Sequence, residues 1–258
     1  MAETIQTELN DGIHTITIDH PKANALSLGM IQLLLKAFHA AGRDSQTRAV
    51  LLRSEGENFS AGQDVYEMLH AGDQSYRQHM LETYNPLILQ IRRLDKPVLA
   101  EIQGTVAGAA LGIVLACDLR VASQDARFLV GFLGIGLALD SAVSLFLPAM
   151  IGLGRATQAA FTNEPISAQQ ALNWGLVNRV VPTQDLHASA LGFAKALING
   201  PVHAMGLAKR DFNQALYPNL EQVLDYEAHI QEIARVGTEH KEGVKAFIEK
   251  RAPVWANS

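Results

Sequence analysis

Apolar and polar residues alternate near the start of the chain. Residues 4–9 and 13–18 both follow this alternation, and Asn10-Asp11-Gly12 separates them. Alternation buries one face of a strand, and an Asp-Gly pair supplies the positive φ that a tight turn requires. The pattern therefore predicts an antiparallel hairpin at the start of a sheet.

The period of the apolar positions then becomes helical. Four apolar residues recur at helical spacing between residues 27 and 44, and a short apolar segment at 49–52 follows. The four residues are Ile31, Leu34, Leu35 and Phe38. The same order repeats, with a polar helical region at 74–94, a strand at 97–102, a helix of small residues at 107–116 and a strand at 119–122. Such alternation of strands and helices predicts an α/β fold with largely parallel strand pairing.

Helical patterns dominate after residue 152, and the segment 177–181 is the one stretch there that is typical of a strand. One apolar face of a later helix is marked by Val223, Tyr226, Ile230 and Ile233. We expect residues 1–195 to form the α/β core. Residues 196–258 are expected to form a helical region that packs on this core or on a neighbouring subunit, and not an independent domain.

Composition limits the classes of ligand. The chain has 258 residues, which fits one domain with a sizeable core. Lysine and arginine number 21 and aspartate and glutamate 26, so the formal net charge is −5. There is thus no overall basic field to bind nucleic acid or an anionic membrane. Any anionic ligand must be bound by local groups.

Cysteine content and the N-terminal sequence indicate the cellular compartment in which the protein is expected. Cys117 is the single cysteine, which excludes an intramolecular disulfide and a cysteine-rich zinc site and fits a reducing compartment. The N-terminus carries Glu3 and Glu8 and is unlike a signal peptide. Residues 128–154 contain one charged residue, Asp140, and are long enough to cross a bilayer, but their glycines and proline indicate buried soluble structure. We expect a cytoplasmic protein that does not enter a membrane.

Two glycine-containing loops follow predicted strands, the position at which open α/β folds bind ligands. In residues 59–64, Gly62 lets the backbone approach a ligand closely, and Asp64 can cap the next helix while the amide of Gln63 stays free. Residues 104–112 open a helix N-terminus, whose amides and dipole favour negative charge. Taken alone, the first loop is better explained as a capped turn and the second as close helix packing.

Further motifs accompany these two loops along almost the whole chain. They are Lys96-Pro97 before the second loop, Cys117-Asp118-Leu119-Arg120-Val121-Ala122 after it, and residues 21–26, 167–177 and 240–251. In this order the motifs resemble the crotonase, or enoyl-CoA hydratase/isomerase, superfamily. The resemblance implies an α/β fold with a spiral core of ββα units and a helical C-terminal trimerisation region. It also implies an acyl-CoA substrate and assembly as a homotrimer or as a hexamer.

The resemblance implies an oxyanion hole made of backbone amides. Family members stabilise a thioester enolate with two such amides, which by register are those of Gln63 and Ala109 here. Preorganised donors of this kind are worth about 3 kcal/mol each. Because the amide does the work, the side chain of Gln63 is expected to matter little.

The resemblance also implies a set of groups that bind coenzyme A. These are the turn around Lys22, Ala23 and Ala25, together with Ala61, and the C-terminal Phe247 and Lys250, often contributed by a neighbouring subunit. Two other lysines of the C-terminal segment, Lys241 and Lys245, are better explained as an ordinary solvated helix face.

The residues expected to move protons differ from those of the hydratases. The two catalytic glutamates of family hydratases fall at Gly112 and Phe132, and neither side chain can exchange protons. Residues 133–141 instead resemble the isomerase branch, notably the ring-1,2-epoxyphenylacetyl-CoA isomerases of phenylacetate degradation, in which an acidic residue stands at the place of Asp140. One carboxylate suffices to move a double bond, and apolar neighbours would raise its pKa toward the useful range. Spacing alone favours a different role, in which Asp140 caps a helix that begins near Ser141.

The resemblance thus leads to the prediction of an acyl-CoA isomerase. It needs no cofactor, since coenzyme A enters as part of the substrate, and the nine histidines show no pair at metal-ligand spacing with a nearby carboxylate. The substrate would be an unsaturated or aromatic-derived acyl-CoA. Two alternatives stay open: an enoyl-CoA hydratase or thioester hydrolase of weak activity that uses Asp140 through water, and a catalytically silent acyl-CoA-binding subunit.

Overall fold

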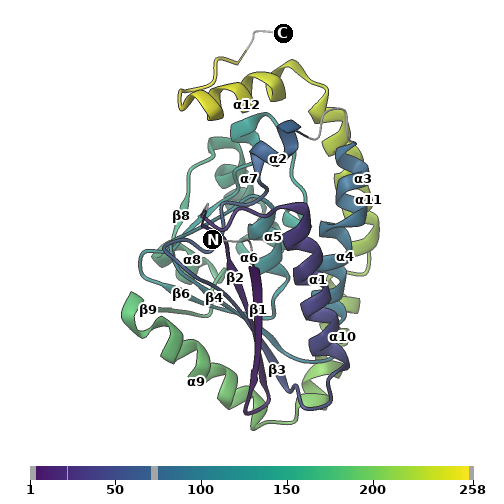
Figure 1. Cartoon of the computed structure of the whole chain (residues 1–258), viewed down its shortest axis with the longest axis vertical. Coiled ribbons are helices and arrows are strands. Elements are labelled where there is room, and N and C mark those ends of the chain that lie inside the picture. The colour runs from purple at the N-terminus through teal and green to yellow at the C-terminus, as the bar shows by residue number, and fades with distance from the viewer. Residues whose placement is uncertain (1–3, 22, 71–74, 256–258) are drawn as a thin grey trace.

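The computed structural model describes residues 4–21, 23–70 and 75–255 and has the predicted α/β architecture (Figure 1). A six-stranded sheet has the order β1-β2-β3-β4-β6-β9, and each neighbouring pair except β1 and β2 is parallel. Its strands are β1 (Thr4–Asn10), β2 (Ile13–Asp19), β3 (Ala49–Ser54), β4 (Val98–Ile102), β6 (Leu119–Ser123) and β9 (Arg179–Val181). The hairpin and the parallel pairing expected from the sequence are both confirmed.

A second, three-stranded sheet has the order β5-β7-β8. Its strands are β5 (Thr105–Ala107), β7 (Arg127–Leu129) and β8 (Ile166–Ser167). The sequence pattern did not predict them, because strands of two or three residues are too short to display a period. This sheet matters for the site, since β5 lies within the second glycine-containing segment, residues 104–112, and leads into α5.

Helices cover both sheets. They are α1 (Leu28–Arg43), α2 (Val65–His70), α3 (Tyr76–Glu82), α4 (Tyr84–Arg93), α5 (Ala109–Ala116), α6 (Val143–Ile151), α7 (Leu153–Thr162), α8 (Ala168–Trp174), α9 (Leu186–Ile198), α10 (Val202–Leu216), α11 (Leu220–Arg235) and α12 (Thr238–Glu249), with 3-10 turns η1 (Leu133–Ile135) and η2 (Thr183–Asp185). The predicted helix at 27–44 is confirmed as α1, which Ser27 caps through a bond from the amide of Met30 (3.2 Å). The predicted helical region at 74–94 is two helices, because Thr83 (φ −128°, ψ −83°) leaves the helical conformation between them.

The central strands of the main sheet are buried on both faces. Val50 and Leu52 of β3 belong to the principal core with α1, α4 and α5, whereas Leu51 packs against α9 on the opposite face. Figure 1 shows α9 on its own, away from the other helices. Burial on both faces explains why residues 49–52 of β3 and 98–100 of β4 are continuous apolar runs rather than alternating segments.

The C-terminal helices return to the core, where α11 packs against α3 and α12 against η1. Helix α12 can approach η1 closely because Gly243 has no side chain. A Cβ atom there would lie only 2.5 Å from the carbonyl carbon of Ile135. The apolar face of α11 marked in the sequence points away from the chain, with Tyr226 63% and Ile233 56% exposed. The inward face carries Leu224 and two polar residues, Glu227 and Gln231.

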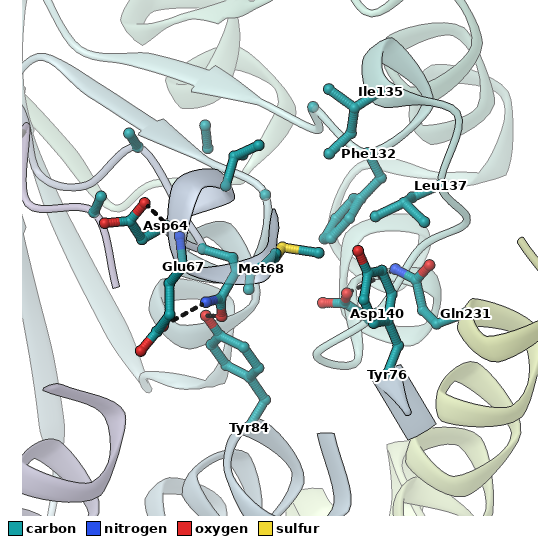
Figure 2. A pocket seen from close by; sticks show the side chains of 18 of the residues that line it. Asp64, Glu67, Met68, Tyr76, Tyr84, Phe132, Ile135, Leu137, Asp140 and Gln231 are labelled. Carbon is teal, nitrogen blue, oxygen red and sulfur yellow. Dashed lines mark hydrogen bonds between the residues drawn. The ribbon is translucent and has the colours of Figure 1, made fainter. Parts of the chain in front are cut away.

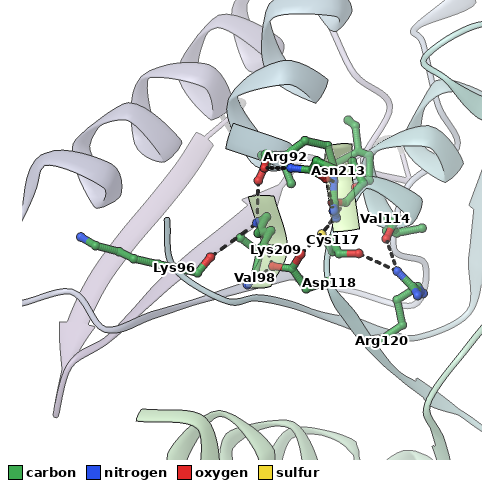
Figure 3. Close-up of polar contacts among 12 residues, drawn as sticks. Arg92, Lys96, Val98, Val114, Cys117, Asp118, Arg120, Lys209 and Asn213 are labelled. Carbon is green, nitrogen blue, oxygen red and sulfur yellow. Dashed lines mark hydrogen bonds and ion pairs between the residues drawn. The ribbon is translucent and has the colours of Figure 1, made fainter. Parts of the chain in front are cut away.

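A buried ionic cluster fastens α10 to the core (Figure 3). The Asp118 carboxylate accepts hydrogen bonds from Lys209 Nζ (2.8 Å), Arg92 Nη1 (3.0 Å) and the amide of Val98 (2.8 Å). The guanidinium of Arg120 donates to backbone carbonyls alongside. Because each buried charge has partners, we interpret this cluster as structural.

The single cysteine lies beside this cluster. Cys117 is buried, and its Sγ–H donates to the carbonyl of Ile113 (3.4 Å). Burial raises the pKa of the Cys117 thiol to about 12. Since the thiolate is the reactive form, this side chain is chemically inert at neutral pH.

Candidate active site

The two glycine-containing loops lie against each other. The amide of Ser60 donates to the carbonyl of Thr105 (3.1 Å), and the amide of Ala107 donates to the carbonyl of Ser60 (3.0 Å). Gly62 has a φ of +86°, and a Cβ atom there would lie 2.7 Å from the Ala107 carbonyl oxygen. Glycine at this position therefore allows the loops to approach closely.

This contact brings the amides of Gln63 and Ala109 to one cavity, which both residues line. Neither amide donates a hydrogen bond to another group in the described part of the chain. Ala109 begins α5, whose first-turn amides have no acceptor within the helix, and its φ is negative, so its methyl group adds no backbone strain. Two unsatisfied amides at one cavity are what a developing oxyanion requires.

The cavity has a volume of about 410 Å³ and a mostly apolar wall (Figure 2). Its apolar lining includes Met68, Met80, Phe132, Ile135 and Leu137. Figure 2 shows Asp140 and Gln231 on one side of the cavity and Glu67 and Tyr84 on the other. An apolar cavity with a few converging polar groups is typical of a small-molecule site.

Asp140 is 9% exposed and lines this cavity. Its Oδ1 accepts a hydrogen bond from Ser141 Oγ (2.7 Å), and its Oδ2 accepts one from Gln231 Nε2 (2.7 Å). Burial raises the pKa of Asp140 to about 7, the bonds from Ser141 and Gln231 oppose this, and the negative charge of Glu227 adds to it. A carboxyl with this pKa exists in both protonation states near neutrality.

The capping role that spacing favoured for the Asp140 side chain is wrong. The first amides of α6 donate instead to Glu227 of α11, from Ala142 to Oε2 (2.7 Å) and from Ser144 to Oε1 (3.1 Å). Because Glu227 supplies the cap, the Asp140 carboxyl is free to face the cavity.

Neither hydratase position carries a carboxyl, and the structure gives a reason at one of them. A Cβ atom at Gly112 would lie 2.3 Å from the carbonyl oxygen of Ser141, so no side chain fits there without displacing the residue that follows Asp140. Phe132 is 5% exposed and contributes its ring to the cavity wall. Of the two positions, Phe132 thus forms part of the apolar wall near Asp140, whereas Gly112 is not a member of the wall.

The side chain of Gln63 has more partners than the sequence suggested. Its Oε1 accepts hydrogen bonds from Tyr84 Oη (2.7 Å) and His79 Nε2 (3.1 Å), and its Nε2 donates to Glu67 Oε2 (3.2 Å). The Asp64 carboxylate caps α2, as predicted, by accepting from amides two and three residues later (2.9 and 3.3 Å). These contacts fix the loop that presents the Gln63 amide, and Tyr84, His79 and Glu67 were not singled out from the sequence.

The residues that the resemblance assigns to coenzyme A lie at two places. Ala25 and Ala61 line the cavity, and the carbonyl of Ala23 accepts a hydrogen bond from the amide of Ala61 (3.0 Å). The Asn24 side chain braces this turn by donating to the carbonyls of Glu55 and Asn58 (2.7 and 2.8 Å). Lys22 lies outside the described residues.

The C-terminal pair comes from α12 and its end. Phe247 is 53% exposed and lines the cavity of its own chain. Lys250 is exposed at the C-cap of α12, with a φ of +53°, and is not part of the cavity wall. Phe247 therefore reaches the site without a neighbouring subunit.

Residues 4–21, 23–70 and 75–255 hold neither a candidate metal cluster nor a candidate membrane-spanning helix. No cluster of three or more histidine, cysteine, aspartate or glutamate side chains lies there in a position to hold a metal ion. None of the helices described is both long enough and apolar enough to span a bilayer.

Known proteins resemble this chain along nearly its whole length. The sequence model of the enoyl-CoA hydratase/isomerase family matches residues 8–258. The 1,2-epoxyphenylacetyl-CoA isomerase of Escherichia coli K12 is 32% identical over 98% of both chains, and the trans-2-decenoyl-acyl-carrier-protein isomerase of Streptococcus mutans is 32% identical over 95% of both. A solved enoyl-CoA hydratase from Mycobacterium avium subsp. paratuberculosis superposes with a TM-score of 0.89 at 31% identity, covering 98% of each chain. The expected crotonase-like fold is confirmed, whereas these names divide between isomerase and hydratase.

Proposed function

The chain belongs to the enoyl-CoA hydratase/isomerase family, and from this premise we propose that it is an acyl-CoA isomerase in which Asp140 transfers the proton. One observation carries the proposal: the Asp140 carboxyl lines the same cavity as the unpaired amides of Gln63 and Ala109. Asp64 and Glu67 also line this cavity, but backbone amides at the starts of α2 and α1 occupy their carboxylates.

The proposed reaction is a shift of a double bond along the acyl chain. Ionised Asp140 removes a proton from the carbon beside the thioester carbonyl, and the electron pair of that C–H bond passes into a conjugated enolate. The amides of Gln63 and Ala109 donate to the enolate oxygen. Protonated Asp140 then returns the proton to the far carbon of the conjugated system. Atoms and electrons balance without water, metal or cofactor, and a pKa near 7 suits a group that takes and returns a proton.

Turnover of 3-hexenoyl-CoA tests this function directly, with products resolved by mass spectrometry and proton NMR. We expect 2-hexenoyl-CoA, which has the mass of the substrate and a conjugated double bond. Accumulation of the hydrated acyl-CoA would support the hydratase alternative. Release of free coenzyme A would support the thioester hydrolase alternative. If neither this substrate nor an aromatic-derived acyl-CoA is changed although both bind, the isomerase proposal is wrong and a silent binding subunit takes its place.

Lys250 is proposed to bind the phosphates of coenzyme A. Its neighbour Arg251 is paired with Glu242 and Glu249, whereas Lys250 has no ion-pair partner in the described chain. We expect Lys250→Ala to weaken coenzyme A binding about 3- to 10-fold at low salt and less at high salt, because exposed charge pairs are screened. Calorimetric titration at two salt concentrations measures this. Lys241→Ala, on the same helix, is the matched control, and equal affinity of both variants and the parent would contradict the assignment.

Assembly into a homotrimer or a hexamer is also proposed. The outward face of α11 exposes Tyr226 and Ile233, and the nearby α10 exposes Phe212 (61%) and Leu216 (60%). Exposed apolar residues on these two consecutive helices favour burial against other copies of the chain.

A further inference from the structure

The residues after Asp140 form a strained corner that has to be held in place. Ser141 and Ala142 both adopt left-handed backbone conformations, with φ of +55° and +62°. Residues other than glycine rarely adopt the left-handed region of φ and ψ. Two such residues in succession therefore persist only where the surroundings fix them. The Ser141–Ala142 corner is also packed against α5, because the missing side chain of Gly112 makes room for Ser141.

Glu227 of α11 holds this corner from the opposite side. Its side chain is buried, with the residue 3% exposed, and it accepts three hydrogen bonds. The donors are the Ala142 amide (2.7 Å), the Ser144 amide (3.1 Å) and Ser144 Oγ (2.5 Å). Burial raises the pKa of the Glu227 carboxyl, and the three hydrogen bonds oppose this rise. The donors and the N-terminus of α6 are the groups that stabilise the ionised form.

The same helix also contacts Asp140 itself. Gln231 lies one turn after Glu227 on the inward face of α11, is 1% exposed and donates through Nε2 to Asp140 Oδ2 (2.7 Å). Ser141, the first residue of the corner, donates to Asp140 Oδ1 (2.7 Å). Asp140 is thus held through two contacts, one directly from α11 and one through the corner that α11 fastens.

We propose that Glu227 is a positioning residue for the isomerase reaction, acting through Asp140 by locking the Ser141–Ala142 corner and by placing a second negative charge beside the Asp140 carboxyl. The inference rests on the proposed function of Asp140. It adds a residue that lies 87 positions away in the sequence and is not a member of the cavity wall.

The direction of the electrostatic effect follows from the groups around Asp140. A neighbouring carboxylate disfavours ionisation of Asp140, and the charge of Glu227 contributes to its raised pKa after burial, the larger cause. Asp64 and Glu67 are the other carboxylates that line this cavity, and Tyr84, Tyr76 and His79 are neutral titratable groups of the same wall. Burial raises the pKa of Tyr84 on α4 and Tyr76 on α3, and it lowers the pKa of His79 on α3.

Glu227→Gln removes the charge and conserves the size of the side chain. Its amide oxygen can still accept from Ser144, whereas its NH2 group replaces the oxygen that accepts from the Ala142 amide. We expect the midpoint of Asp140 ionisation to fall by about 0.5–1 pH unit, and the acidic limb of the kcat/KM profile to move to lower pH by the same amount. Glu227→Ala also releases the corner and should lower kcat about 100-fold with KM little changed. Glu221→Gln, at an exposed position of α11 paired with Arg93, is the control and should leave both readouts at the parent value.

Infrared spectroscopy with carbon-13-labelled aspartate measures the Asp140 midpoint without substrate, and the band missing in Asp140→Asn assigns it. A midpoint unchanged in Glu227→Gln would refute the electrostatic coupling, and a parent-like kcat in the same variant would overturn the positioning role as well. A lowered midpoint in a protein that isomerises no acyl-CoA would refute the proposed function while supporting the coupling of Glu227 to Asp140. Since Glu227→Gln conserves size, the test holds even if Glu227→Ala does not fold.

Discussion

Asp140→Asn should abolish the isomerisation of 3-hexenoyl-CoA, lowering kcat by about 10³-fold or more, while coenzyme A binds with unchanged affinity. The amide has nearly the shape of the carboxyl and can still accept from Ser141, but it cannot take a proton from carbon. Steady-state kinetics check the loss of turnover, and a binding titration on the same preparation checks the affinity for coenzyme A. Residual turnover within tenfold of the parent would remove Asp140 from the mechanism.

The same substitution should make the protein more stable above neutral pH. The folded-state pKa of Asp140 is raised from 3.8 to about 7, so the folded protein binds this proton more tightly than the unfolded chain does. The cost of burying the charge is therefore absent below about pH 4, grows as pH rises, and reaches at most about 4 kcal/mol above pH 7. We expect Asp140→Asn to add about 2 kcal/mol to the free energy of unfolding at pH 8 and almost nothing at pH 4.

Urea denaturation at both pH values measures this difference. Asp211→Asn, at an exposed position of α10, provides the control and should change stability little at either pH. A gain that is equal at pH 4 and pH 8 would show that the effect of Asp140→Asn is not electrostatic.

Gly112→Glu restores the glutamate of the hydratases in sequence but is not expected to restore hydratase activity. The new Cβ atom would lie 2.3 Å from the Ser141 carbonyl oxygen and 2.5 Å from the Ser141 Cβ, and both belong to a packed corner rather than a flexible side chain. Overpacking together with a buried charge should lower the free energy of unfolding by about 3 kcal/mol or more. Displacement of Ser141 should also disturb Asp140 and reduce isomerase turnover.

Denaturation curves and hydration of 2-hexenoyl-CoA are the measurements. Gly192→Glu on α9 is the matched control, because no heavy atom lies within 4 Å of the Cβ position there and the residue is exposed. That variant should keep or slightly raise the stability of the parent, since glycine is a poor helix former. Hydration by a stable Gly112→Glu variant would show that the corner can move aside.

The regular part of the fold could be predicted from the sequence because its elements are long enough to display a period. Helix α1 and the first hairpin follow directly from apolar spacing, a serine cap and an Asp-Gly turn. The strands β5, β7 and β8 carry no such signal, and they exist because neighbouring segments supply their hydrogen-bond partners. Propensity within two or three residues is too weak to predict them.

The residues of the candidate site could be predicted where they stand in short, contiguous sequence motifs. The loops with Gln63 and Ala109 and the acidic Asp140 stand in recognisable motifs, and all three residues line one cavity. Glu227 and Gln231 were missed because their partners are 83 to 93 residues away. Their spacing was a weak signal, because Glu227 and Gln231 stand four residues apart and so share one face of α11. That face is opposite the apolar face marked in the sequence, and polar residues in such a position are usually solvated.

The buried state of Cys117 has a practical consequence for separating the isomerase from a thioester hydrolase. Hydrolysis of an acyl-CoA releases the free thiol of coenzyme A, which a thiol-specific dye detects continuously. The chain has one cysteine, and burial keeps its thiol protonated and shielded while the protein is folded. Under native conditions, any colour that develops therefore reports coenzyme A released from substrate and not the protein itself.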